Sequence, residues 1–234
     1  MIAKRHSSKN KLPDMTKSIF LLFIPIMIMQ SCITSLQPLV TKNTVVTDSR
    51  LIGTWNSDGQ DYTIQKVVES DVYKKYKESS MSFSSPPFKR DSILYSKSYV
   101  IHYVKNKIKY NLYGSMIQLN GEYFMNFSLA DLNDDDSSSI SEREICPTCF
   151  LQSYTIARIR FSNSHTIKLE FINGDFLYEQ INAGRMKLKH ETDELYDTFL
   201  ITASTNELQQ FILKYGKDDR FFDKENSVTL IRKS

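Results

Sequence analysis

The sequence predicts a mostly β domain of antiparallel strands, either a closed barrel or a β-sandwich, with two short helices near the C-terminus. Aromatic and β-branched residues fill 98–104, and apolar and polar residues alternate over 107–113. This period of two is typical of strands. Between two later apolar runs, Asn120-Gly121 suits a type I′ hairpin turn, because both central residues of that turn need a positive φ.

More strands are expected on both sides of this centre, and the domain is expected to start near Arg50. In residues 152–161, Ala157, Ile159 and Phe161 should face the core, because alternate residues of a strand share one face. Residues 162–164 should form the turn of this second hairpin. The further strands are expected at 51–55, 61–68, 152–161, 166–172, 186–190, 199–202 and 227–232.

The two helices are predicted from capping residues. Asp175 can cap a helix over 176–182, with Gly184 just past its end. Ser204 can cap the second helix, and Glu207, three residues on, completes a capping box. The apolar stripe that should face the core consists of Leu208, Phe211, Ile212 and Tyr215.

The first 32 residues have the features of an export signal. Five basic residues and one acid lie in residues 1–17, and an apolar run over 19–29 follows. A basic start and a short apolar stretch are typical of a secretory signal, and the run is shorter than the roughly 20 residues that span a bilayer. Residues 28–32, which end in Ser31-Cys32, resemble the lipobox of bacterial lipoproteins. The resemblance implies cleavage before Cys32 and acylation of its sulfur; an ordinary secretory signal or an uncleaved anchor is the alternative.

This interpretation divides the chain into three parts. Residues 1–31 are the expected signal peptide, and residues 32–49, Thr-rich with little periodicity, are expected to be the lipidated cysteine and a flexible tether. Residues 50–234 form a single β-rich domain. No acidic residue directly follows Cys32. We therefore expect a lipid-anchored protein of the bacterial cell envelope, on the outer membrane and facing the periplasm.

The charge argues against a nucleic-acid partner. The whole chain has a net charge of +3, but residues 1–31 hold five bases and one acid, which leaves residues 32–234 at −1. Binding to phosphate backbones needs a basic face.

A short motif near the start of the domain is found in one class of barrel. Gly53-Thr54-Trp55 resembles the G-x-W motif of lipocalins, and Trp55 is the single tryptophan of the chain. The resemblance implies that the glycine relieves crowding at the base of the barrel, that the indole plugs the base, and that a late basic residue, here Arg232, packs over the indole. The alternative is a β-sandwich with a buried tryptophan. The segment 200–222 is also similar to uncharacterised bacterial lipoproteins, which brings no activity with it.

Cys146-Pro-Thr-Cys149 is the sharpest chemical motif. A thioredoxin-like redox site needs this pair on a strand-to-helix turn and a later proline facing it, but Pro147 is the last proline of the chain. A metal site has two thiolates here and no second cysteine pair. We expect a small structural disulfide, since the pair would lie in an oxidising compartment; redox and metal roles are the alternatives.

An acidic segment echoes a calcium-binding loop. Asp131, Asn133, Asp135 and Glu142 lie at ligand positions 1, 3, 5 and 12 of the EF-hand spacing. Asp136 replaces the glycine that makes the turn, so a solvated acidic loop is the preferred interpretation. No cofactor is expected.

These features favour a non-catalytic binding lipoprotein for a small apolar or amphipathic ligand, since an eight-strand barrel has room for one small ligand. The alternative is an envelope scaffold or assembly factor that binds protein partners. A hydrolase is least favoured, because no nucleophile motif is present; His102 or His190 close to acids would favour it. The candidate ligand-lining residues are Tyr99, Tyr103, Tyr110, Phe124 and Phe127; the alternative is that they only fill the core.

Overall fold

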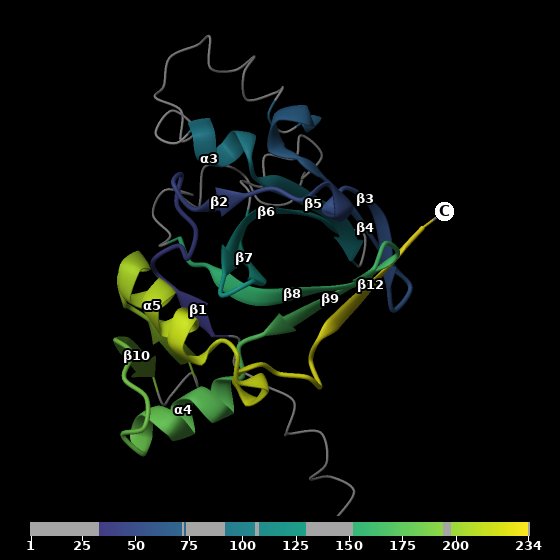
Figure 1. Ribbon diagram of the computed structural model, residues 1–234. Helices are drawn as coiled ribbons and strands as arrows, with labels where there is room; N and C mark the ends of the chain where they lie inside the picture. The colour runs from purple at the N-terminus through teal and green to yellow at the C-terminus, as the bar shows by residue number, and fades with distance from the viewer. Residues whose placement is uncertain are drawn as a thin grey trace, which may run out of the picture. The chain divides into compact units, whose positions relative to one another are not determined.

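Eight antiparallel strands close into a barrel in the computed structural model, which describes residues 33–71, 73, 92–105, 108–129, 152–193 and 198–233 (Figure 1). The barrel strands are β3 (Gly53–Ser57), β4 (Gln60–Lys66), β5 (Tyr99–Lys105), β6 (Ile108–Leu119), β7 (Glu122–Leu129), β8 (Thr155–Asn163), β9 (Thr166–Phe171) and β12 (Val228–Arg232). Each strand pairs with the next one along the chain, and β12 returns to pair with β3. This confirms the predicted mostly β, antiparallel fold in its barrel form, and closure leaves no free edge around the barrel.

A small α/β insertion separates the last two barrel strands. It contains α4 (Gly174–Asn182), β10 (His190–Asp193), β11 (Thr198–Ile201), α5 (Thr205–Tyr215) and the 3₁₀ helix η6 (Asp219–Phe221). Strand β11 is the centre of a second sheet, with β10 on one side and β1 (Thr34–Ser35) on the other. Figure 1 shows α4, α5 and β10 grouped beside the barrel.

Local sequence signals place both helices. The predicted capping box of α5 is present, with Ser204 and Glu207 bonded to each other's backbone N–H groups. Helix α4 begins earlier than expected, because the side chain of Asn173, rather than that of Asp175, accepts the bond from the N–H of Phe176. In the part of the chain that the structure describes, no helix is long and apolar enough to cross a membrane.

Tight turns set the strand register. Asn120 and Gly121 have φ values of 52° and 83°, as the predicted type I′ turn requires. Asp58 and Gly59, at 51° and 78°, make the same kind of turn between β3 and β4. The second predicted hairpin turns at residues 164–165 rather than 162–164, because β8 continues to Asn163.

Two hydrophobic cores lie on opposite sides of the barrel wall. The inner core fills the barrel and includes Trp55, Tyr99 and Ile159. The outer core lies between the barrel and the insertion, and it includes Phe124 and Ile156. As expected, Ala157, Ile159 and Phe161 lie on the inner face of β8. On the opposite face, Ile156 and Arg158 are also buried, under the insertion, whereas Arg160 is exposed.

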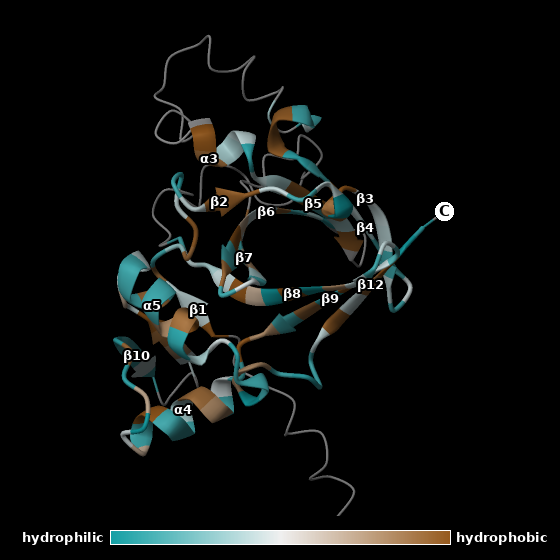
Figure 2. Cartoon of the chain, viewed as in Figure 1, coloured by the Kyte–Doolittle hydropathy of each residue, from teal (hydrophilic) through white to brown (hydrophobic). Residues whose placement is uncertain are grey.

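The segment expected to be a flexible tether is part of the fold. Ile33, Leu39 and Val40 are buried in the outer core, and β1 pairs in parallel with β11. Strand β2 (Val45–Val46), coloured hydrophobic in Figure 2, pairs with β6. The prediction of a tether over 33–49 was therefore wrong, and the domain begins at or before Ile33 rather than near Arg50. The segment lacks periodicity because its order comes from partners far along the chain.

Three short elements complete the structure. The 3₁₀ helix η2 (Ser49–Leu51) precedes β3, and η3 (Val67–Glu69) follows β4, so the strand expected over 61–68 ends at Lys66. Helix α3 (Ser92–Ser96), which the sequence did not predict, leads into β5.

Candidate functional site

The barrel has two chemically different ends. We name them by their inward residues: the tryptophan end, with Trp55 and Arg232, and the tyrosine end, with Tyr103 and Tyr110. Tyr62 lies between the two, directly across from Trp55 on β4. Strands β3 and β12 bring the first pair into register. Strands β4, β5 and β6 bring the three tyrosines side by side across neighbouring strands.

At the tryptophan end, the structure brings together the residues of the G-x-W motif and the late arginine. Trp55 is fully buried, and its indole N–H donates to the carbonyl of Leu51 at 2.9 Å. The guanidinium carbon of Arg232 lies 4.2 Å from the centre of the indole ring, a cation–π arrangement. The same guanidinium donates to the carbonyls of Arg50 and Ile52. These bonds hold the residues that precede β3 in place beside the indole of Trp55.

Gly53 is required by this contact. Its φ is +138°, where side chains are rarely tolerated, and a Cβ atom at this position would collide with Nη1 of Arg232. The glycine therefore gives the guanidinium room to reach the backbone beside the indole.

The interior next to the tryptophan end is filled by side chains. Tyr99 and Met116 are fully buried, and a Cβ on Gly114 would lie 2.8 Å from the sulfur of Met125. The hydroxyl of Tyr99 donates to the carbonyl of Asp48 and accepts from its N–H. Tyr99, which was predicted to line a ligand site, is therefore part of this packed core.

The tyrosine end holds a second group of inward aromatics. The rings of Tyr103 and Tyr110 stack with centroids 4.9 Å apart, and Tyr62 lies 5.4 Å from Tyr103. Phe127 lies 6.4 Å from Phe171 across the inner face. These rings are half-buried. Tyr103, Tyr110 and Phe127 are therefore the predicted lining residues that the structure brings to one end of the barrel.

Phe124 does not line the barrel. It packs against Phe222 in the outer core, with ring centroids 6.1 Å apart. Phe124 and Phe127 are three residues apart on β7, and residues an odd number apart face opposite sides of a strand. The two could not both line the interior, so the prediction for Phe124 is corrected.

Burial affects the acidity of the tyrosine end. It raises the pKa of Tyr62, with a contribution from Asp58, and raises the pKa of Tyr103, with contributions from Tyr110 and Tyr62. Both hydroxyls therefore stay protonated at neutral pH. They can donate hydrogen bonds to the polar group of a bound molecule while the rings contact its apolar part.

A buried arginine joins the barrel wall to the insertion. Arg158 of β8 is 0% exposed and pairs with Glu170 of β9 at 2.7 Å and with Asp219 of η6 at 3.0 Å. Its guanidinium also lies 3.9 Å from the ring centre of Phe222. Burial alone would raise the pKa of Glu170, but Arg158 and its basic neighbours hold it below its usual value. The sequence showed alternation here but nothing that marked Arg158 as buried.

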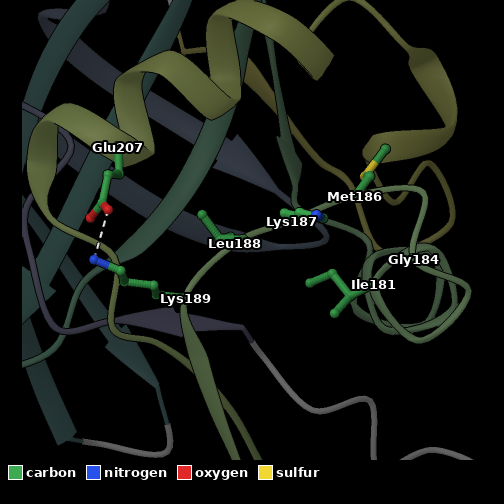
Figure 3. Close-up of a pocket in the computed structure, with 7 residues that line it drawn as sticks. All are labelled: Ile181, Gly184, Met186, Lys187, Leu188, Lys189 and Glu207. Atoms are coloured by element: carbon green, nitrogen blue, oxygen red, sulfur yellow. Dashed lines mark ion pairs between the residues drawn. The ribbon is translucent and has the colours of Figure 1, made fainter.

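The insertion carries a groove that the sequence did not predict. It encloses about 510 Å³ and runs from the end of α4 to the start of α5 (Figure 3). Lys189 and Glu207 pair at 2.8 Å at one end of it, and Met186 and Gly184 lie at the other. The lining residues are Ile181, Gly184, Met186, Lys187, Leu188, Lys189 and Glu207.

The histidines of the hydrolase alternative have structural partners. His102, on the outer face of β5, hydrogen-bonds Gln65 and Asn111 on the two neighbouring strands. His190 stacks on Phe199 with ring centroids 4.7 Å apart and bonds the carbonyl of Leu188. Among the described ranges, no three His, Cys, Asp or Glu side chains are grouped to hold a metal ion.

Several predicted sites lie outside the described residues. These are the lipidation site Cys32, the expected disulfide and the calcium candidate, made up of Cys146, Cys149, Asp131, Asn133, Asp135 and Glu142. They stay predictions. Comparison with protein-family models, curated proteins and solved structures found no match to the chain.

Proposed function

We propose that this protein is a lipid-anchored module of the bacterial cell envelope, attached through Cys32, that binds one small apolar or amphipathic molecule at the tyrosine end of its barrel. The observation that carries the proposal is the asymmetry of the barrel. Trp55, Tyr99 and Met116 are fully buried towards the tryptophan end, whereas Tyr103, Tyr110 and Phe127 are inward-facing and half-buried. An apolar body could contact these rings while the neutral hydroxyls bond a polar group.

Native mass spectrometry tests the ligand. Residues 33–234, which hold the described fold, are exported to a periplasm and purified without detergent. The expected result is a retained adduct that is reduced in Tyr103→Ala and unchanged in Val104→Ala, since Val104 is the outward-facing neighbour and is 50% exposed. A clean apo mass after incubation with envelope lipids would contradict ligand binding.

The alternative function is that of an envelope scaffold that binds a protein partner. The groove beside α4 and α5 supports this alternative, since its apolar side chains are edged by Lys187 and Lys189. Leu188→Glu would then abolish recovery of one defined partner from envelope extracts and leave any lipid adduct intact.

A further inference from the structure

The described fold begins at Ile33, directly after the expected lipidation site Cys32. Ile33, the residue after Cys32, is 6% exposed. Ser35 is fully buried and exchanges two backbone hydrogen bonds of 2.8 Å with Tyr154. Successive Cα atoms are about 3.8 Å apart, so a lipid on Cys32 would start one residue from the packed domain.

This attachment point lies at the tyrosine end of the barrel. Tyr154 directly precedes β8, whose first residue, Thr155, pairs with Phe127. The chain then follows the outside of the barrel to β2, which pairs with residues 116 and 117 of β6, and on to Asp48, which bonds Tyr99. Residues 33–48 therefore run from the tyrosine end to the tryptophan end, and Ile33 lies at the former.

We propose that the tyrosine end of the barrel docks on the lipid bilayer that holds the anchor, so that its ligand is a membrane amphiphile exchanged directly with the lipid leaflet. The inference rests on the proposed lipidation of Cys32. A tether over residues 33–49 could have held the domain roughly 55–60 Å from the bilayer, but direct attachment holds this end at the surface. Tyrosines suit that position because they pair an apolar ring with a polar tip.

A matched pair of tryptophan probes tests the docking. Leu129, at the tyrosine end, is 65% exposed, and Ile231, at the tryptophan end, is 57% exposed. Leu129→Trp and Ile231→Trp are made in the full chain, expressed with its lipid and reconstituted in phosphatidylethanolamine–phosphatidylglycerol vesicles with or without brominated acyl chains. Wild type gives the Trp55 baseline.

The expected result is loss of fluorescence in brominated vesicles for Leu129→Trp and no loss beyond the baseline for Ile231→Trp. Equal quenching of the two, or stronger quenching of Ile231→Trp, would overturn the docking. A Gly-Ser spacer as long as residues 33–49, inserted after Cys32, should abolish the quenching of Leu129→Trp; quenching that survives would contradict the role of direct attachment.

The intact mass of the same samples separates the two proposals. An added acyl mass that disappears in Cys32→Ala, together with equal quenching of the two probes, would leave the anchoring standing and overturn the docking. A chain without added mass would overturn the anchoring, and the docking with it.

Discussion

At the scale of single residues, the tryptophan end depends on a glycine that makes room for an arginine. Gly53→Ala should destabilise the domain by about 1–3 kcal/mol, because it adds backbone strain at φ +138° and a collision with Arg232. Gly59→Ala is the control: its φ of +78° is also strained, but nothing lies within 4 Å of the added Cβ, so its cost should be smaller. Urea unfolding followed by fluorescence of Trp55 measures both. An equal cost for the two would contradict the proposed role of the contact.

Arg158 should matter more than any other ionic side chain of the described barrel wall. Arg158→Met leaves the carboxylate of Glu170, itself 3% exposed, without its closest cation. The expected loss is about 1–3 kcal/mol, because Glu170 keeps Arg160 and Lys168 as partners but loses its buried hydrogen bond from Arg158. Arg160 also pairs with Glu170 and Asp219 but is 44% exposed, so Arg160→Met should cost less than about 1 kcal/mol. Urea unfolding measures the loss of unfolding free energy in each variant. Equal losses for Arg158→Met and Arg160→Met would show that the burial of Arg158 is unimportant.

At the scale of elements, the start of α5 should be sensitive to acid. The ion pair with Lys189, and then the bonds from Ser204, lower the pKa of Glu207 to about 2. The lowered pKa means that Glu207 stabilises the fold above its unfolded pKa, roughly 4.3, and that this contribution disappears as the pH falls towards 2. Glu207→Gln should therefore flatten the loss of stability between about pH 5 and 2. Glu191→Gln, on exposed β10, is the control for the loss of one acidic side chain.

The N-terminal segment should behave as part of the core. Leu39 is fully buried, and its N–H donates to the side chain of Asn126 at 2.8 Å. Leu39→Ala should cost about 2–5 kcal/mol, whereas Leu36→Ala, at a half-buried position, should cost less. Thermal unfolding of residues 33–234 measures both. If Leu39→Ala had no effect, residues 33–49 would be a tether in solution after all.

Patterns among neighbouring residues predicted the turns and helices better than they predicted the residues of the candidate site. The Asn120-Gly121 turn and the Ser204 capping box are fixed by residues within a few positions of one another, so the sequence showed them. Leu39 gave no periodic signal, because its partners lie on β7 and α5. Phe124 was misplaced because composition marks a strand as aromatic without showing which face each ring takes. The groove lined by Met186 and Leu188 exists only once the two helices of the insertion have packed.

At the scale of the whole molecule, the barrel and the insertion are held together from two sides. Arg158 and Phe222 connect them through the outer core. Residues 33–48 connect them a second time, because β1 pairs with the insertion and β2 with the barrel. The insertion is thus a layer over the wall made by β7 and β8, and its stability should not be separable from that of the barrel.

This double connection predicts a single cooperative unfolding transition. Fluorescence of Trp55 reports the barrel, and hydrogen exchange of the α5 amides reports the insertion; the two should give the same free energy of unfolding. Arg158→Met removes the ion pair between β8 and Asp219 of the insertion. The insertion should therefore loosen first, so that α5 exchanges at a lower free energy than the barrel strands. Leu230→Ala, which opens a cavity in the inner core instead, should lower both values together. Exchange of α5 well below the global value in the wild type would mean that the insertion opens independently of the barrel.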